Sequence, residues 1–153
     1  MGTGRGSEDY SGSAGSLGQA LFEGYFGILW TGDGFDLQPR LGRDSGRIHA
    51  YIPAADAFIA YEYTHSPQDD RINVSFNSSS EKTGKIRVLS PWKDLENETD
   101  GGKEPSLHVL LDNNEIPFSL QRLNSDTYIV LDTDFQHHTL SIQKVKENSS
   151  LPF

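Results

Sequence analysis

The sequence predicts a mainly β fold, an antiparallel β-sandwich of about eight strands preceded by one N-terminal α-helix. Residues 11–28 have a helical spacing of apolar side chains, and short apolar runs separated by turn signals occupy most of the chain that follows. A soluble domain normally buries an apolar helix against other helices or a sheet. A lone helix followed at once by a β-rich region therefore indicates that its usual neighbours lie outside this sequence.

Composition limits the class of protein. A chain of 153 residues with 35% hydrophobic and 10% aromatic content can build the core of one domain. The net charge of -9 argues against a nucleic-acid partner, which needs a basic surface. Apolar runs are too short for a membrane span, and we expect a soluble chain without a signal peptide of its own. The absence of cysteine excludes disulfides and thiolate sites and leaves the compartment unknown; we expect no cofactor.

The predicted helix occupies residues 11–29, after a flexible tail at residues 1–10. Ser11 or Ser13 can cap its first amides, and Gly27 lies where a left-handed C-terminal cap is expected. Four further glycines imply close approach of a neighbouring backbone, unless the helix is simply a poor one. One face is apolar, widened by Phe22 and Phe26, and comprises Ala14, Leu17, Gly18, Leu21, Tyr25 and Ile28.

The β-sandwich is predicted over residues 30–146, with a tail at 147–153. Clean alternation of apolar and polar side chains in 71–77 and 138–145 is typical of half-buried antiparallel strands. Residues 112–115 and 123–126 are hairpin signals, Pro39 places the first strand at an edge or rim, and the charged segment 93–105 is an exposed loop. The expected strands are residues 35–41, 47–52, 57–64, 71–77, 85–89, 107–111, 116–122, 128–132 and 138–145.

Several motifs together resemble a known family. They are residues 11–15 (SGSAG), 20–28 (ALFEGYFGI) and 36–41 (DLQPRL), followed by 85–92 (KIRVLSPW), 109–118 (VLLDNNEIPF) and 128–131 (YIVL). This order is similar to the last barrel helix and C-terminal β-sandwich of the six-hairpin, (α/α)6-barrel glycoside hydrolases and phosphorylases. The resemblance covers roughly residues 10–145 and is strongest over 11–41.

The resemblance implies that the catalytic carboxylates are absent, because in that family they lie on barrel loops upstream of the last helix. In the phosphorylase branch, the loop before that helix borders the sugar or phosphate site, and it matches Ser11, Gly12 and Ser13 here. Hydroxyls and amides at a helix N-terminus suit an anion. The simpler alternative is that these serines only cap the helix.

Other residues could carry sugar chemistry on their own. Trp30, Tyr61 and Trp92, with Tyr51 and Tyr63, could stack on pyranose rings, although aromatic side chains in a sandwich more often belong to the core. Glycoside hydrolysis needs two facing carboxyl groups. The nearest candidates are Glu23, Asp33 and Asp36, and we expect none of them to be catalytic.

The five histidines show no spacing typical of metal ligands, and we expect no metal site. They are His49, His65, His108, His137 and His138. Four N-glycosylation sequons occur as well, and chance alone could produce them in a chain rich in Asn and Ser. They begin at Asn73, Asn77, Asn97 and Asn148.

The sequence thus predicts a non-catalytic C-terminal region of a carbohydrate-active enzyme, supporting a barrel that this chain does not contain. A free-standing carbohydrate-binding sandwich and a protein-docking module remain as alternatives. Expected partners are a carbohydrate, and either a barrel-bearing polypeptide or a second copy at the face of Leu17, Leu21 and Tyr25.

Overall fold

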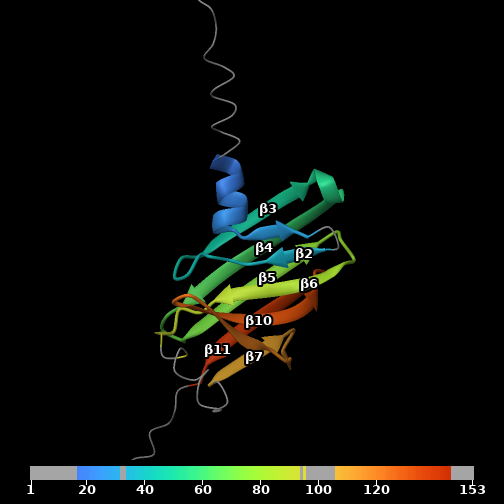
Figure 1. The fold of residues 1–153 in the computed structure, drawn as a ribbon. Helices are drawn as coiled ribbons and strands as arrows, with labels where there is room; N and C mark the ends of the chain where they lie inside the picture. Colours follow the sequence, from blue (N-terminus) through green and yellow to red (C-terminus); the bar gives the residue numbers. More distant parts are fainter. Residues whose placement is uncertain (1–16, 32–33, 94, 96–105, 146–153) are drawn as a thin grey trace, which may run out of the picture.

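The computed structural model describes residues 17–31, 34–93, 95 and 106–145. It confirms a mainly β chain in which two stacked sheets form a β-sandwich, with one short helix at the N-terminal side (Figure 1). The five-stranded sheet has the order β1 (Ile28–Trp30), β2 (Phe35–Leu37), β6 (Thr83–Leu89), β10 (Asp126–Asp134), β9 (Ser119–Leu123). The six-stranded sheet has the order β3 (Gly46–Ile52), β4 (Ala57–Ser66), β5 (Arg71–Ser78), β11 (His138–Lys144), β7 (Leu107–Leu111), β8 (Asn114–Glu115).

The core lies between the sheets and follows the period-2 pattern of the strands. On β5, Ile72, Val74 and Phe76 are buried while the residues between them are more exposed. The same alternation on β4 buries Tyr61 and Tyr63. Because each strand turns one set of side chains inward, the two inner faces interdigitate and exclude water.

The observed strands differ from the predicted ones near two prolines, Pro39 and Pro117. Strand β2 ends at Leu37, before Pro39, and it is not an edge strand, because it lies between β1 and β6 and pairs with β6 in parallel. The strand expected over 116–122 begins only at Ser119, as β9, and the preceding strand β8 belongs to the other sheet. Pro117 lies between them, and since proline has no N–H to donate, the ladder ends there and the chain crosses over.

Both predicted hairpins are confirmed. Asp112 and Asn113 have φ values of 50° and 67° and join β7 to β8, with Leu111 opposite Asn114. Asn124 has a φ of 57° in the turn that pairs Leu123 with Asp126. Asn and Asp tolerate this left-handed conformation better than other non-glycine residues do, which explains why the turn signals were readable.

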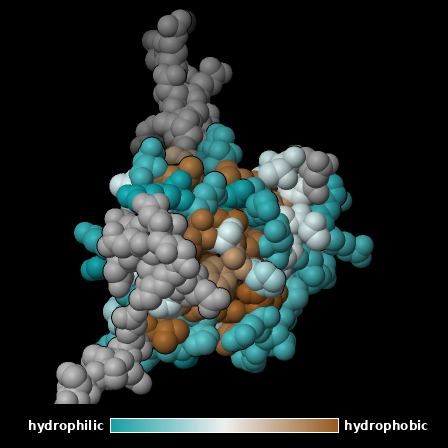
Figure 2. All heavy atoms as spheres, turned by 60° about the horizontal axis from the view of Figure 1, so that its bottom comes forward, coloured by the Kyte–Doolittle hydropathy of each residue, from teal (hydrophilic) through white to brown (hydrophobic). Residues whose placement is uncertain are grey.

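Apolar side chains also reach the surface of the sandwich. Figure 2 shows them gathered in the middle of the face that lies at the bottom of Figure 1, with polar residues around them. Partly buried residues from the β7–β9 region pack against the core, namely Leu111, Ile116, Phe118 and Leu120. Among the described residues, no helix has the length and apolar character needed to cross a membrane.

Candidate functional site

The helix at the N-terminal side ends earlier than the sequence predicts. Residues 17–25 are helical, with π-type hydrogen bonding in η1 (Ala20–Tyr25), and Ile28 already belongs to β1. The Phe26 amide donates to the carbonyl oxygen of Leu21 at 2.9 Å, which closes a wider final turn than an α-helix has. Part of the predicted helix, residues 11–16, lies outside the described residues.

Gly27 redirects the chain from the helix into the sandwich, as predicted from its place after the helix. Its φ is +63°, and a Cβ atom added there would lie 1.8 Å from the carbonyl oxygen of Gln38. The Gln38 amide donates to the carbonyl oxygen of Gly27 at 2.7 Å. Only glycine combines this left-handed conformation with so close a backbone contact.

Three further contacts hold the end of the helix on the sandwich. The Tyr61 hydroxyl donates to the carbonyl oxygen of Phe26 at 2.6 Å, and their rings meet edge to face at 6.0 Å between centroids. The Arg40 amide donates to the carbonyl oxygen of Tyr25 at 3.1 Å. Burial raises the pKa of Tyr61 well above its usual range, so the phenol stays protonated and keeps its donor. The helix is therefore fixed at its C-terminal end.

The N-terminal part of the helix extends away from the strands at the top of Figure 1, while Phe22 is partly buried and packs against the core. No residue of η1 is buried among the described residues, and Leu17, Leu21 and Tyr25 are 64%, 49% and 36% exposed. A Cβ atom added to Gly18 would meet nothing within 4 Å. Gly18 lies on the same side as Leu21 and Tyr25 at i, i+3, i+7 spacing. We call Leu17, Gly18, Leu21 and Tyr25 the helix face.

The polar side of the helix carries Gln19 and Glu23, whose side chains are hydrogen-bonded to each other at 3.1 Å. Such an i, i+4 pair is a solvent-facing feature of helices. Asp36 lies in β2 and accepts bonds from the Lys85 amide at 3.1 Å and the Arg87 guanidinium at 2.7 Å. These local partners give Glu23 and Asp36 structural roles; Asp33 lies outside the described residues.

The predicted stacking residues occupy three different places. Tyr61 is 3% exposed and anchors the helix, while Trp92 is 9% exposed and belongs to the core. Trp30 on β1 is partly buried, meets Phe35 edge to face, and has the Lys82 ammonium 5.4 Å from its ring centroid. The three do not form one platform, and the burial of Tyr61 and Trp92 fits the alternative that they serve the core. Ser11, Gly12 and Ser13 lie outside the described residues.

One histidine forms a charged cluster with two carboxylates. His138 Nδ1 lies 2.6 Å from an Asp112 carboxylate oxygen, and Nε2 lies 2.7 Å from Asp134. The hydrogen bond to Asp112 raises the pKa of His138. The bond to His138 lowers the pKa of Asp112, and the bond from the Gln136 amide, followed by the bond to His138, lowers the pKa of Asp134. The cluster ties the β7–β8 turn to the β10–β11 turn. The described residues contain no group of His, Asp and Glu arranged to hold a metal ion.

The sequence did not indicate that Gln38 and Arg40 take part in the helix attachment. Both contribute only a backbone amide, and the type of side chain does not predict such a contact. Tyr61 was identified as an aromatic of interest, but with a different role. The one readable signal was Gly27, because a glycine directly after a helical run indicates a left-handed cap.

No protein-family model and no curated protein matches this chain. Among solved structures it is similar to a GH127 β-L-arabinofuranosidase from Geobacillus stearothermophilus T6. The TM-score is 0.49 and the sequence identity 14%, over 84% of this chain and 18% of that one. The chain thus spans less than a fifth of the length of that enzyme. A likeness of this degree assigns neither an activity nor a substrate.

Proposed function

We propose that this chain is the non-catalytic C-terminal β-sandwich region of a carbohydrate-active enzyme, and that its N-terminal helix completes an (α/α)6 barrel that the chain does not contain. The observation that carries this proposal is the helix face, which is exposed on a helix held to the sandwich through its C-terminal end and Phe22. The motifs of residues 11–41, similar to the last helix of such barrels, supply the identity of the missing neighbour.

The chemistry of the helix face favours other helices as its neighbour. Apolar side chains beside a glycine allow a facing helix to approach closely and to bury both surfaces. The Gln19–Glu23 pair on the other side keeps that side in water. A barrel helix covered on one face and solvated on the other has this pattern.

The first test is the coding sequence upstream of Met1 and in the neighbouring genes. We expect it to encode the hairpins of an (α/α)6 barrel with a pair of catalytic carboxylates. If no such sequence lies there, the proposal is wrong.

The second test joins the barrel polypeptide to this chain, by fusion or co-expression, and measures glycosidase and phosphorylase turnover and the melting temperature of the barrel. We expect Leu17→Glu and Leu21→Glu to lower both, because each puts a charge into the contact. Gln19→Lys, on the opposite side of the same helix, is the matched control: it adds a charge but keeps a partner for Glu23 at i, i+4, and it should change neither. Equal effects of the three substitutions would contradict the role of the helix face.

The isolated chain should show no turnover on aryl glycosides or on sugar phosphates with phosphate. It should self-associate through the helix face, since an exposed apolar stripe favours pairing. Sedimentation velocity should therefore show a concentration-dependent dimer for the unaltered chain and a monomer for Leu21→Glu. Turnover by the isolated chain would refute the non-catalytic assignment.

A further inference from the structure

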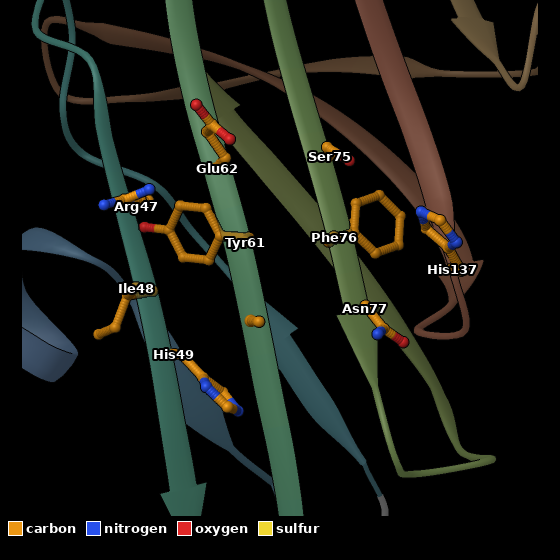
Figure 3. Close-up of a pocket in the computed structure, with 10 residues that line it drawn as sticks. Arg47, Ile48, His49, Tyr61, Glu62, Ser75, Phe76, Asn77 and His137 are labelled. Atoms are coloured by element: carbon orange, nitrogen blue, oxygen red, sulfur yellow. The ribbon is translucent and has the colours of Figure 1, made fainter.

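A hollow lies on the outer face of the six-stranded sheet, across β3, β4 and β5. Its volume is about 450 Å³, within the usual size range of ligand sites. Figure 3 shows Arg47 and His49 on β3, Glu62 on β4, and Ser75 and Asn77 on β5 along three neighbouring strands, with His137 beyond them. This face is the side opposite to the core.

Strand register arranges the side chains of the hollow in rows. Arg47 lies opposite Glu62, which lies opposite Ser75; two residues along, His49 lies opposite Ala60, which lies opposite Asn77. Ala60 is the smallest side chain in either row, and it forms the floor of the hollow. Residues two apart in a strand are separated by about 7 Å, so the two rows present polar groups on both sides of a narrow strip of the sheet surface.

The next row along the same face is aromatic. Tyr51 lies opposite Phe58, their ring centroids are 4.9 Å apart, and they are 47% and 49% exposed. The Tyr51 hydroxyl donates to an Asp56 carboxylate oxygen at 2.6 Å, which holds that ring in place. His49 adds a third ring, 5.5 Å from Phe58. Two large aromatic side chains left in water beside a polar hollow are unusual for a surface that serves only solubility.

Some hydrogen-bond donors and acceptors of the hollow have no partner in the described part of the chain. Within the described part of the chain, no hydrogen bond or ion pair engages the side chains of Arg47, Glu62 and Asn77. Arg47 can only donate, an ionised Glu62 can only accept, and Asn77 can do both. Sugar hydroxyls donate and accept at once, so they can use all three.

The charges argue against an anionic ligand. One guanidinium faces one carboxylate across the strands, and the chain as a whole has a net charge of -9. A polyanion would meet Glu62 without a cluster of basic groups to hold it. A neutral, polyhydroxylated ligand with apolar C–H faces fits both the rows and the aromatic pair.

We propose that the outer face of β3, β4 and β5 binds a neutral oligosaccharide. Tyr51 and Phe58 stack on the apolar face of one sugar ring, and Arg47, Glu62 and Asn77 hydrogen-bond to the hydroxyls of the next. This site is separate from the helix face and does not depend on the barrel-supporting role.

The test is affinity gel electrophoresis of the chain in soluble arabinan, arabinoxylan, galactomannan and mixed-linkage β-glucan. The protein is produced in a bacterial cytoplasm, so that the sequon at Asn77 carries no glycan. We expect retardation by at least one of these polysaccharides, and a roughly tenfold weaker association for Phe58→Ala because the stacked ring is lost. Glu62→Gln should weaken it as well, since a charged acceptor makes the stronger hydrogen bond.

Leu123→Ala is the matched control, because Leu123 is an exposed apolar residue of similar exposure, 46%, on β9 in the other sheet. It should bind as the unaltered chain does, and so should Leu21→Glu on the helix face, which separates this site from the proposed barrel contact. Circular dichroism melts confirm that each variant is folded. The proposal is overturned if none of the four polysaccharides retards the chain, if Phe58→Ala and Leu123→Ala bind alike, or if polygalacturonate retards the chain as strongly as the neutral glycans.

Discussion

The attachment of the helix to the sandwich can be tested by removing one oxygen atom. In Tyr61→Phe the ring keeps its packing, but the 2.6 Å hydrogen bond to the carbonyl oxygen of Phe26 is lost. A net hydrogen bond contributes about 1 kcal/mol, and leaving a partly buried carbonyl without its partner adds to that. We expect the helix end to open more easily by about 1–2 kcal/mol, which is a factor of roughly 5–30 in the open population.

Tyr63→Phe is the matched control. The Tyr63 hydroxyl donates to the carbonyl oxygen of Gly42 at 2.7 Å, and its ring lies two residues along on the same inner face of β4. Both substitutions remove one buried hydroxyl, so their effects on global unfolding in urea should be similar.

Amide hydrogen exchange separates the two variants. Phe26 and Arg40 donate bonds that close the helix end, at 2.9 Å to Leu21 and 3.1 Å to Tyr25. Their exchange should accelerate by the above factor in Tyr61→Phe and stay near the original rate in Tyr63→Phe. If both variants accelerate these amides alike, or neither does, the Tyr61 hydroxyl does not hold the helix.

Three other predictions concern the strands and turns. Gly27→Ala forces a Cβ atom to within 1.8 Å of the Gln38 carbonyl at a φ of +63°, and it should lower the free energy of unfolding by about 2 kcal/mol or more, measured in urea. Asp36→Asn weakens the 2.7 Å bond from Arg87 and should lower the free energy of unfolding in urea by about 1 kcal/mol. High salt should destabilise the unaltered protein by only part of this amount, because the Asp36–Arg87 pair is partly buried and therefore less screened. The pKa of His138 is raised, so the stability that its charged form contributes is present below the ordinary pKa of 6.5 and is lost as pH rises through the raised value. The melting temperature of the unaltered chain should therefore fall over that pH range. In His138→Gln this part of the pH dependence should be absent. An NMR titration of the His138 ring that gives an ordinary pKa would contradict the last prediction.

Many strands and turns of the sandwich could be predicted from local sequence patterns. Strands β4, β5, β7 and β11 appear within two residues of their predicted ends, because each has one face in the core and the alternation marks it. The hairpin at Asp112 was readable because a two-residue turn needs residues that accept a positive φ.

The features that the sequence did not determine depend on partners far away in the chain. Nothing near β2 in the sequence indicates that it pairs in parallel with β6. The roles of Tyr61 and Trp92 depend on which side of their strand or loop meets the other sheet. The hollow across β3, β4 and β5 was not predicted either, since its rows arise from the register between three strands, although Tyr51 was among the aromatic residues considered for sugar stacking.

The sequence by itself determined the fold class, the turns and the apolar character of the helix, because these follow from propensity and from the period of side chains along one segment. Only the tertiary structure decided that the helix is attached at its end and exposed along its face, and that Ala60 forms the floor of a hollow lined by polar rows. Both features depend on which segments become neighbours, and that is set by packing the whole chain around one core.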